Sequence, residues 1–474
     1  MLCEKCHENQ ATFIISVSVD SSIKEIRVCE ECATCDTGNG FPNTKRASRT
    51  LDRKCPECHS GYSRSALLGC PVCYTEFRKE LISDLRRIHG STIHKGKIPN
   101  RKSKKGSRIS KKASSLASTD LSSRLLAKAK WMRGDGPDCD VVISTRVRLA
   151  RNISGHAFCS SAEKSELHQI AAAVENAMAK ISEYKNSRLS KVSIIRLEDL
   201  GPIDREFLIE RHLISRDLAE KNGTGKVIVD EEEVVSMMIN EEDHIRLQVI
   251  DSGLRLRQSW ERINSVDDEL GQEIDYVFSP DWGYLTACPT NVGTGLRVSM
   301  MLHIPALAAT KEGKRILSSI SDMGYAVRGI YGEGSQATGA FYQISNEATL
   351  GWSEEEILDR IRWVARQIVD HERKARRLLM ENNRIGAEDR IFRSYGTLMN
   401  ARLISSKEAL KLLSWVSLGS SVGILPEASG TDITRLLVLT RPAHLQKCKG
   451  GKLDSMDRDI RRATAIREIL ESNR

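Results

Sequence analysis

Four Cys-x-x-Cys pairs in the first 75 residues constrain the fold of this chain more than any other feature of its sequence. Each pair places two thiols at one tight turn, and two such turns can hold four thiolates about 2.3 Å from one zinc ion. The spacing therefore predicts two structural zinc sites in small zinc-ribbon modules. A closed four-thiolate shell leaves no position for a reacting water, so we expect these modules to bind a partner or to regulate. The ligands of the first site are Cys3, Cys6, Cys29 and Cys32, with Cys35 as the alternative to Cys32, and those of the second are Cys55, Cys58, Cys70 and Cys73.

The rest of the composition indicates a soluble chain in a reducing compartment. Its 474 residues are 40% hydrophobic and 28% charged, as in ordinary soluble proteins. No run approaches the roughly 18 apolar residues of a membrane span. The first residues, MLCEKCHENQ, have charges and cysteines where a secretory signal needs an apolar run. We therefore expect a cytoplasmic protein without membrane contact, in which metal binding is favoured over disulfides or free thiols.

Changes of composition divide the chain into four predicted segments. Residues 1–97 carry the cysteine modules, and residues 98–130 form a basic flexible linker that contains the run RKSKKGSRISKK. Strand and helix patterns alternate from 131 to 385, which predicts a domain built around a sheet. This domain also carries the candidate catalytic residues discussed below and is called the catalytic segment. Residues 386–474 show helical periodicity without a good strand run, so we expect a helical C-terminal domain.

Local patterns predict individual elements within the catalytic segment. A strand is expected over CDVVISTRVRLARN, and two consecutive strands over VIVDEEEVVSMMIN and HIRLQVI. Ser160 with Glu163 precedes one amphipathic helix, and Ser353 with Glu356 precedes a second, long and charged helix. Both Ser-x-x-Glu patterns predict a capping box at the start of the helix.

Arginines stand out in the polar segments STRVR, NEEDHIR and CPTNVGTGLR of the catalytic segment. Arg146 and Arg148 lie two residues apart on a strand, so both guanidinium groups project from one face. With Arg246 and Arg297 they suit a triphosphate, because arginine donates bidentately to phosphate oxygens. One such arginine alone is more often a solvated surface charge. Four beside these motifs favour phosphate binding.

Three adjacent acids, Glu241, Glu242 and Asp243, follow the apolar strand MMIN. A guanidinium substrate explains them, because protonated arginine is a poor nucleophile and needs a carboxylate that orients it and accepts its proton. A solvated acidic turn is the alternative. The segment Thr290 to Gly295 supplies turn glycines and backbone donors for phosphate. Cys288, just before it, is either a thiolate near arginines or a buried structural cysteine.

These segments resemble the phosphagen (guanidino) kinase family, whose members carry STRVR, NEEDH and CPTN-x-GT in this order. The resemblance spans about 138–370. It continues through DRIFRSYGTLMNARLIS as in the bacterial protein-arginine kinase branch. The N-terminal part resembles the separate zinc-finger activator of that kinase, through MLCEKCHENQATF, the second cysteine quartet and IHGSTIHKGKIP. The chain therefore resembles activator and kinase fused.

The resemblance implies an α+β fold in which helices flank an antiparallel sheet, with a helical C-terminal domain used for dimerisation. It implies ATP with Mg²⁺ as the phosphoryl donor and exposed arginines of proteins as acceptors. It also implies that the marked proteins go to a Clp-type unfoldase and protease, as part of stress regulation.

The resemblance further assigns roles by position. Glu242, with neighbouring Glu241, matches the catalytic carboxylate, and Cys288 matches the reactive cysteine of the family. Nucleotide-phosphate ligands are matched by Arg146, Arg148, Arg246 and Arg297.

Two further positions bear on regulation and activity. Arg458, Asp459 and Arg462 match the RDxxRA motif, which the resemblance connects with phosphoarginine binding at a regulatory pocket. In the loop RGIYGEGSQA, Gln336 stands where arginine-specific members place a second catalytic glutamate. An amide can orient a guanidinium but cannot take its proton, so Glu333 of the same loop is the alternative carboxylate.

Four functions compete on these observations. The first is a protein-arginine kinase with its activator built in. The second is a pseudokinase adaptor that binds phosphoarginine or nucleotide and recruits partners through the zinc modules; the arginines and Glu242 argue against it. The third is nucleic-acid binding through the basic run, which lacks interleaved aromatic residues. The fourth is a kinase of free arginine, disfavoured because the chain lacks the helical N-terminal domain that the resemblance implies for that branch.

Overall fold

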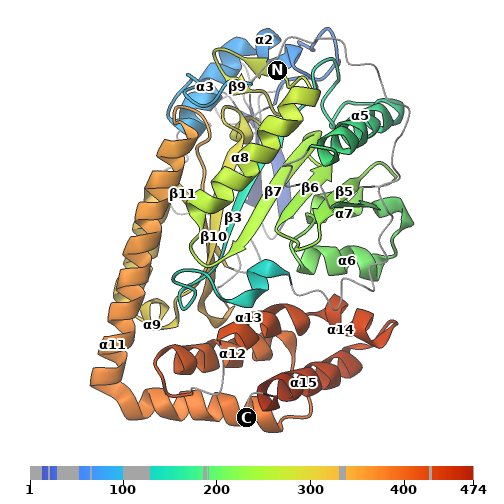
Figure 1. Ribbon diagram of the computed structural model, residues 1–474. Helices are drawn as coiled ribbons and strands as arrows, with labels where there is room; N and C mark the ends of the chain where they lie inside the picture. The colour runs from blue at the N-terminus through green and yellow to red at the C-terminus, as the bar shows by residue number, and fades with distance from the viewer. Residues whose placement is uncertain are drawn as a thin grey trace.

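A large antiparallel sheet organises this computed structural model (Figure 1). The structure describes residues 13–19, 22–28, 53–63, 67–99, 129–184, 189, 192–221, 223–329, 338–425 and 430–472. Within them the sheet has eight strands in the order β11-β12-β10-β3-β7-β6-β5-β4, and all neighbours are antiparallel. The strands are β3 (Val142–Arg151), β4 (Val192–Arg196), β5 (Lys226–Asp230), β6 (Val235–Ile239), β7 (Ile245–Ser252), β10 (Leu296–His303), β11 (Tyr325–Gly329) and β12 (Phe341–Asn346).

Strand β3 shows why the two faces of the sheet differ. Successive side chains of a strand point to opposite faces. Val147 and Leu149 are fully buried in the main apolar core, whereas Arg146 and Arg148 lie half-buried on the other face. The apolar face is completed by side chains of the neighbouring strands, among them Leu247, Val249, Val298 and Met300.

Helices α5 (Lys164–Ser182), α8 (Leu256–Glu273) and α11 (Glu354–Asn400) contribute their apolar sides to the same core (Figure 1). The predicted antiparallel sheet flanked by helices is therefore confirmed. No helix among the described residues is long and apolar enough to span a bilayer. The shorter helices of this part are α6 (Pro202–Glu210), α7 (Arg216–Glu220), α9 (Pro305–Ala308) and α10 (Lys311–Asp322), and a two-stranded sheet joins β8 (Phe278–Ser279) to β9 (Gly283–Tyr284).

One predicted strand is divided in two. The run VIVDEEEVVSMMIN, expected to be continuous, forms β5 and β6 with a turn at its three glutamates. Glu233 adopts a left-handed backbone conformation with φ of 54°, and the Asp230 carboxylate accepts a hydrogen bond of 2.9 Å from the Val235 amide across the turn. The sequence did not indicate this turn, because apolar residues flank it on both sides and it contains no glycine or proline. A carboxylate that accepts a backbone hydrogen bond can form such a turn instead.

Only one of the two predicted capping boxes is present. Ser353 and Glu356 exchange both bonds at the start of α11, as predicted. The prediction for Ser160 is wrong, because α5 begins at Lys164 and Glu163 occupies the capping position without a side-chain bond. Ser160 Oγ instead donates 2.8 Å to the carbonyl of Leu68 in the zinc module, a contact that a local pattern does not reveal.

The C-terminal region is helical, as predicted. Helix α11 has a non-helical residue at Asn383, close to the predicted domain boundary at 385/386, and then continues below the sheet (Figure 1). Its last part packs with the other C-terminal helices around a separate apolar core. Glu210 at the end of α6 links the two parts by accepting the backbone amides of Ala443 and His444 at 2.8 and 2.9 Å. These helices are α12 (Ser406–Ser421), α13 (Gly430–Leu439), α14 (Pro442–Lys449) and α15 (Ser455–Glu471).

The N-terminal region contributes short elements. Strands β1 (Phe13–Val19) and β2 (Ser22–Val28) pair as an antiparallel hairpin. Helices α2 (Val72–Glu76) and α3 (Arg78–His89) lie at the end of the sheet beside β9 (Figure 1). The predicted first zinc site, Cys3, Cys6, Cys29 and Cys32, lies outside the described residues, as does almost all of the predicted basic linker.

Candidate active site and zinc cluster

The four predicted phosphate-binding arginines come together on the polar face of the sheet. Arg297 on β10 lies directly opposite Arg148 on β3, and Arg146 is two residues along the same strand. Arg246 on β7 lies opposite Ala150, which is on the Arg148 face of β3. Because the strands are in register, the guanidinium groups share one surface.

Arginine charges predominate on this surface, although Glu241 pairs with Arg246. Burial, followed by the charges of Arg246 and Arg297, lowers the pKa of Arg146 to about 10. Burial, followed by the charges of Arg146, Arg246 and Arg297, lowers the pKa of Arg148 well below its usual range. Moreover, the Nε of Arg148 is buried without a hydrogen-bond partner among the described residues. A bound anion would offset the repulsion within this cluster, and arginine donates bidentately to phosphate oxygens.

Three side chains that sequence reasoning did not assign belong to the same surface. Arg146 donates from Nη2 to Gln343 Oε1 at 3.0 Å and from Nε to Ser299 Oγ at 3.3 Å. Arg328 on β11 lies opposite Gln343 and, after burial, is the main cause of the lowered pKa of Arg297. Arg328 opens the glycine-rich loop, but only the order of the strands brings it to this face.

Glu241 and Glu242 differ in their chemistry although they are neighbours. Glu241 is fully buried and accepts from Arg246 Nη1 at 2.5 Å. Burial raises the pKa of Glu241, but Arg246 outweighs it and holds that pKa at about 2. Glu241 is therefore a permanent anion that fixes Arg246, and it is a poor proton acceptor near neutral pH.

Glu242 has the properties of a proton acceptor. Burial, followed by the charge of Asp243, raises the pKa of Glu242 to about 7. Its Oε1 accepts a hydrogen bond of 2.7 Å from the side-chain amide of Asn291. A carboxylate whose pKa lies near the working pH is the best compromise between being deprotonated and being basic.

Asp243 and His244 explain why the acidic run is not a solvated turn. Asp243 is buried and accepts from Asn152 Nδ2 at 2.6 Å and from the Ala287 amide at 2.7 Å. His244 is buried as well, with Nδ1 accepting from the Ile153 amide at 3.0 Å. These bonds connect the loops around Glu242, so the alternative of a plain acidic turn is wrong.

Cys288 lies next to this carboxylate rather than in a purely cationic setting. Its Sγ is 3.0 Å from Thr290 Oγ1. Burial, followed by the charge of Glu242, raises the pKa of the Cys288 thiol. In this arrangement the neutral thiol is favoured over the thiolate. Glu333 and Gln336 lie outside the described residues, so their roles stay predictions.

The three residues of the predicted phosphoarginine motif lie on α15. Arg462 is buried, donating from Nε to the Thr440 carbonyl and from Nη1 to the Ile404 carbonyl, both at 2.8 Å, and pairing with Asp459. Arg458 donates to the Leu453 carbonyl at 2.9 Å. An adjacent open pocket is lined by Lys449, Leu453, Asp457, Ile460, Arg461 and Thr464. Arg462 thus braces the helical domain, and its role in binding stays a prediction.

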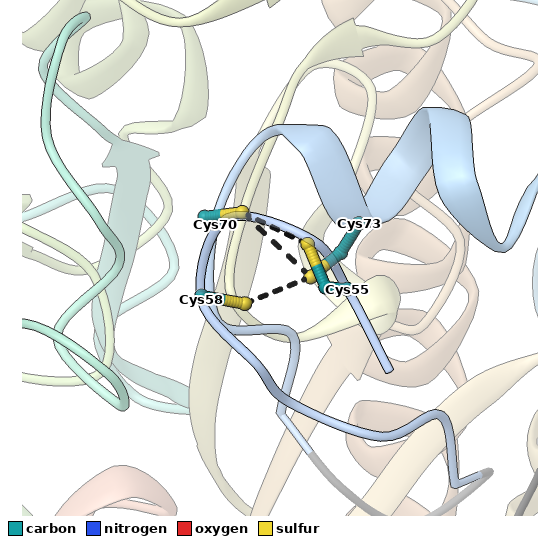
Figure 2. Close-up of side chains that lie close together, drawn as sticks. All are labelled: Cys55, Cys58, Cys70 and Cys73. Carbon is teal, nitrogen blue, oxygen red and sulfur yellow. Dashed lines mark hydrogen bonds between the residues drawn. The ribbon is translucent and has the colours of Figure 1, made fainter. Parts of the chain in front are cut away.

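The second cysteine quartet forms a cluster suited to zinc (Figure 2). The Sγ atoms of Cys55 and Cys70 are 3.6 Å apart, those of Cys58 and Cys73 are 3.4 Å apart, and those of Cys70 and Cys73 are 3.9 Å apart. A tetrahedral ion with bonds of about 2.3 Å requires sulfurs about 3.8 Å apart. The four thiols therefore fit one structural zinc ion.

The zinc module packs directly on the catalytic part. Its Tyr74, Phe77 and Leu81 share an apolar cluster with Trp282 and Val292 of the loops beside Glu242. At the end of the module, Lys97 Nζ lies 2.6 Å from the buried carboxylate of Asp267 on α8. Contacts across more than 150 positions of sequence carry no local signal, so they were not predicted.

Comparisons with protein families match three parts of the chain. The ATP:guanido phosphotransferase C-terminal catalytic domain matches residues 172–375. The protein-arginine kinase McsB C-terminal domain matches residues 384–474, and the McsA central zinc-finger domain matches residues 53–96.

Curated relatives are similar over most of their length. A protein-arginine kinase of Brevibacillus brevis is 48% identical over 346 residues, which are 72% of this chain and 95% of that protein. The protein-arginine kinase of Bacillus subtilis is 44% identical over 344 residues, 73% of this chain and 94% of that protein.

Solved structures resemble the chain in fold. A lombricine kinase has a TM-score of 0.50 at 22% identity, covering 65% of this chain and 80% of that one. A duplicated taurocyamine kinase from Schistosoma mansoni has a TM-score of 0.52 at 21% identity, covering 72% of this chain and 48% of that one.

Proposed function

The chain belongs to the protein-arginine kinases, and we propose that it transfers the γ-phosphoryl group of ATP to arginine side chains of proteins. The observation that carries this proposal is the position of Glu242. Glu242 lies in the turn between β6 and β7, close to Arg246 of the arginine surface. Its carboxylate has a pKa of about 7. A proton acceptor next to a polyphosphate site is what phosphorylation of a guanidinium requires.

In the proposed reaction each group has a distinct task. Arg146, Arg148, Arg246 and Arg297 hold the phosphates and stabilise the charge that spreads over the transferred group. A guanidinium nitrogen attacks the γ-phosphorus, the N–P bond forms as the bond to the bridging oxygen breaks, and ADP leaves. The proton of that nitrogen passes to Glu242. Mg²⁺ accompanying ATP would supply further neutralisation of the phosphate oxygens.

We propose that the zinc modules act as a built-in activator and hold two structural zinc ions. The second site is supported by the sulfur spacings around Cys55 and Cys73. Activation in cis is supported by the shared apolar cluster that joins this module to the loop around Cys288 and Asn291. Covalent linkage keeps the module at high effective concentration, so no separate binding event is needed.

Further proposals rest on the family resemblance. We propose modules at 1–97, a linker at 98–130, a catalytic domain at 131–385 and a helical domain at 386–474 that mediates homodimerisation and binds phosphoarginine. We place the protein in the cytoplasm, with a Clp-type unfoldase and protease receiving the marked substrates during stress. Cys288 and the loop carrying Glu333 and Gln336 are proposed to contact the substrate.

The test is to incubate the full chain with ATP, Mg²⁺ and unfolded casein and to map phosphoarginine by mass spectrometry without acid, because the N–P bond is acid-labile. Free arginine is offered in a parallel reaction. Phosphoarginine on casein supports the proposal, whereas phosphorylation of free arginine alone would reassign the substrate. If ATP binds and zinc is present but no phosphoarginine forms on either acceptor, the proposal fails and an adaptor role replaces it.

A further inference from the structure

His89, the last residue of α3, reaches from the zinc module into the catalytic part. Its side chain is buried, with only 5% exposed. Nε2 lies 2.9 Å from the Pro289 carbonyl, and Nδ1 accepts a hydrogen bond of 3.2 Å from the Thr349 amide. These bonds define one tautomer, in which Nε2 carries the proton. Gly90 follows with φ of 70°, a left-handed C-cap that lets the chain turn away directly after the imidazole.

The two partners of His89 hold one turn between them. Pro289 opens the 3₁₀ turn that ends at Asn291. The Thr349 hydroxyl donates to the Val292 carbonyl at 2.7 Å, just beyond that turn. One imidazole therefore connects both ends of the turn to α3.

This turn is joined directly to the proposed proton acceptor. The side-chain amide of Asn291 donates to Glu242 Oε1 at 2.7 Å. A hydrogen bond to the charged form of a carboxylate orients it and lowers its pKa. The chain of contacts thus runs from His89 through the turn to Glu242.

The zinc module makes a second set of hydrogen bonds, to the segment Thr286–Ala287 that precedes the turn. The hydroxyl of buried Tyr74 donates to the Thr286 carbonyl at 2.8 Å, and the Leu68 amide donates to the Ala287 carbonyl at 2.8 Å. Because these bonds and the apolar cluster around Tyr74 do not involve His89, we expect the module to stay attached when the imidazole is removed. The effect of His89 can therefore be separated from docking as a whole.

We propose that His89 is a positioning residue of the kinase, which sets the place of Asn291 and, through it, of Glu242. The inference rests on the proposed function and deepens it, because it names the route by which the zinc module affects catalysis. Burial lowers the pKa of His89 to about 4, so the imidazole stays neutral and keeps both bonds at physiological pH.

The experiment compares His89→Ala, His89→Gln and the wild-type full chain in the phosphoarginine assay. Initial rates are measured against ATP concentration and pH. His59→Asn is the matched control, because His59 lies exposed in the same module with a left-handed backbone that asparagine tolerates. Zinc content and thermal unfolding verify that each variant retains its module.

For His89→Ala we expect kcat to fall about 10- to 100-fold, because a displacement of about 1 Å costs that much. The KM for ATP stays within about twofold, since His89 makes no contact with the arginine surface. The acid limb of the rate profile moves to higher pH as Glu242 loses its donor. His89→Gln recovers part of the rate, because its amide offers one donor and one acceptor.

Two outcomes overturn the inference. In the first, His89→Ala keeps the wild-type kcat and pH profile. In the second, it loses rate with an unmoved acid limb and His89→Gln gives no recovery, which assigns His89 a merely structural role. Absence of phosphoarginine with the wild-type chain is a different result, because it removes the kinase proposal and this one with it.

Discussion

Arg148 on β3 and Arg297 on β10 are direct register partners, so two guanidinium groups face the same side of neighbouring strands. Side chains opposite each other on adjacent strands are close neighbours, and like charges there are destabilising. Burial lowers the pKa of both arginines; the other arginines, Arg297 among them, lower that of Arg148 further, and Arg328 and Arg246 lower that of Arg297. The negative charge of a bound polyphosphate would offset the repulsion between these arginines.

We predict that Arg148→Met raises the melting temperature of the ligand-free protein while weakening ATP binding. The substitution removes a half-buried charge that lies among three other arginines but keeps the apolar stem of the side chain. ATP should then stabilise the variant less than it stabilises the wild type. Thermal unfolding with and without Mg-ATP measures both effects. A ligand-free variant less stable than the wild type would contradict this account of the arginine surface.

Arg151, three residues further along β3, provides the opposite case. Its guanidinium is buried and pairs with Asp267 through two bonds of 3.0 and 2.9 Å. We predict that Arg151→Met costs about 3–5 kcal/mol, because it leaves the buried carboxylate short of a partner. Chemical denaturation of the full chain measures the change. If Arg148→Met and Arg151→Met changed the free energy of unfolding equally, the ion pair with Asp267 would not account for the contribution of Arg151 to stability.

Glu242→Gln is predicted to reduce the rate about 10²- to 10⁴-fold, the usual contribution of a general base. The KM for ATP should change less than with a Glu241 variant, since Glu242 accepts its hydrogen bond from Asn291 whereas Glu241 pairs directly with Arg246. Glu241→Gln should instead raise the KM for ATP, because Arg246 loses the anion that fixes it. Steady-state kinetics on casein separate the two patterns, and an equal loss of kcat in both variants would contradict the separate roles.

The pH dependence follows from the raised pKa of Glu242. The reaction requires the deprotonated carboxylate, so the rate should rise as the pH increases through about 7. The free energy of unfolding depends on pH in the opposite direction to the rate. A carboxyl whose pKa is higher in the folded state contributes stability that is present below its unfolded pKa and is lost as the pH rises through about 7. Glu242→Gln should flatten the pH dependence of stability. An unchanged pH dependence in the variant would show that another group titrates.

Removal of the second zinc site is predicted to lower the rate at least tenfold. Cys70→Ser takes away one of four clustered thiols, and structural zinc supplies folding energy to such modules. Cys448→Ser is the matched control, because Cys448 is exposed on α14, outside the cluster. Native mass spectrometry counts the bound zinc while phosphoarginine formation is followed. Full activity of a zinc-depleted Cys70→Ser protein would rule out activation in cis.

Local patterns in the sequence predicted much of the arrangement of the candidate site. The two-residue spacing of Arg146 and Arg148 predicts one shared face, and in the structure both lie half-buried on the face opposite buried Val147 and Leu149. The spacing of four cysteines predicted the cluster of Cys55 and Cys73 with their partners. Both signals come from short-range geometry, which a strand or a tight turn imposes wherever it lies in the fold.

Long-range contacts were beyond such patterns. The bond from His89 to Pro289 joins residues 200 positions apart, and Arg328 reaches the arginine surface only because β11 pairs with β12 at the edge of the sheet. The predicted capping box at Ser160 was wrong for the same reason, since its hydroxyl donates to the zinc module rather than capping its own helix. The different pKa values of Glu241 and Glu242 likewise depend on which cations the fold places beside each.

The most direct test of the central claim follows the fate of the γ-phosphoryl group. Phosphorus NMR is recorded on the full chain with Mg-ATP and unfolded casein, beside the same mixture with Glu242→Gln. We predict a phosphoramidate resonance that grows as the γ-phosphate signal declines, and its near absence with the variant. Loss of γ-phosphate to inorganic phosphate alone, or equal phosphoramidate formation by the variant, would contradict this prediction.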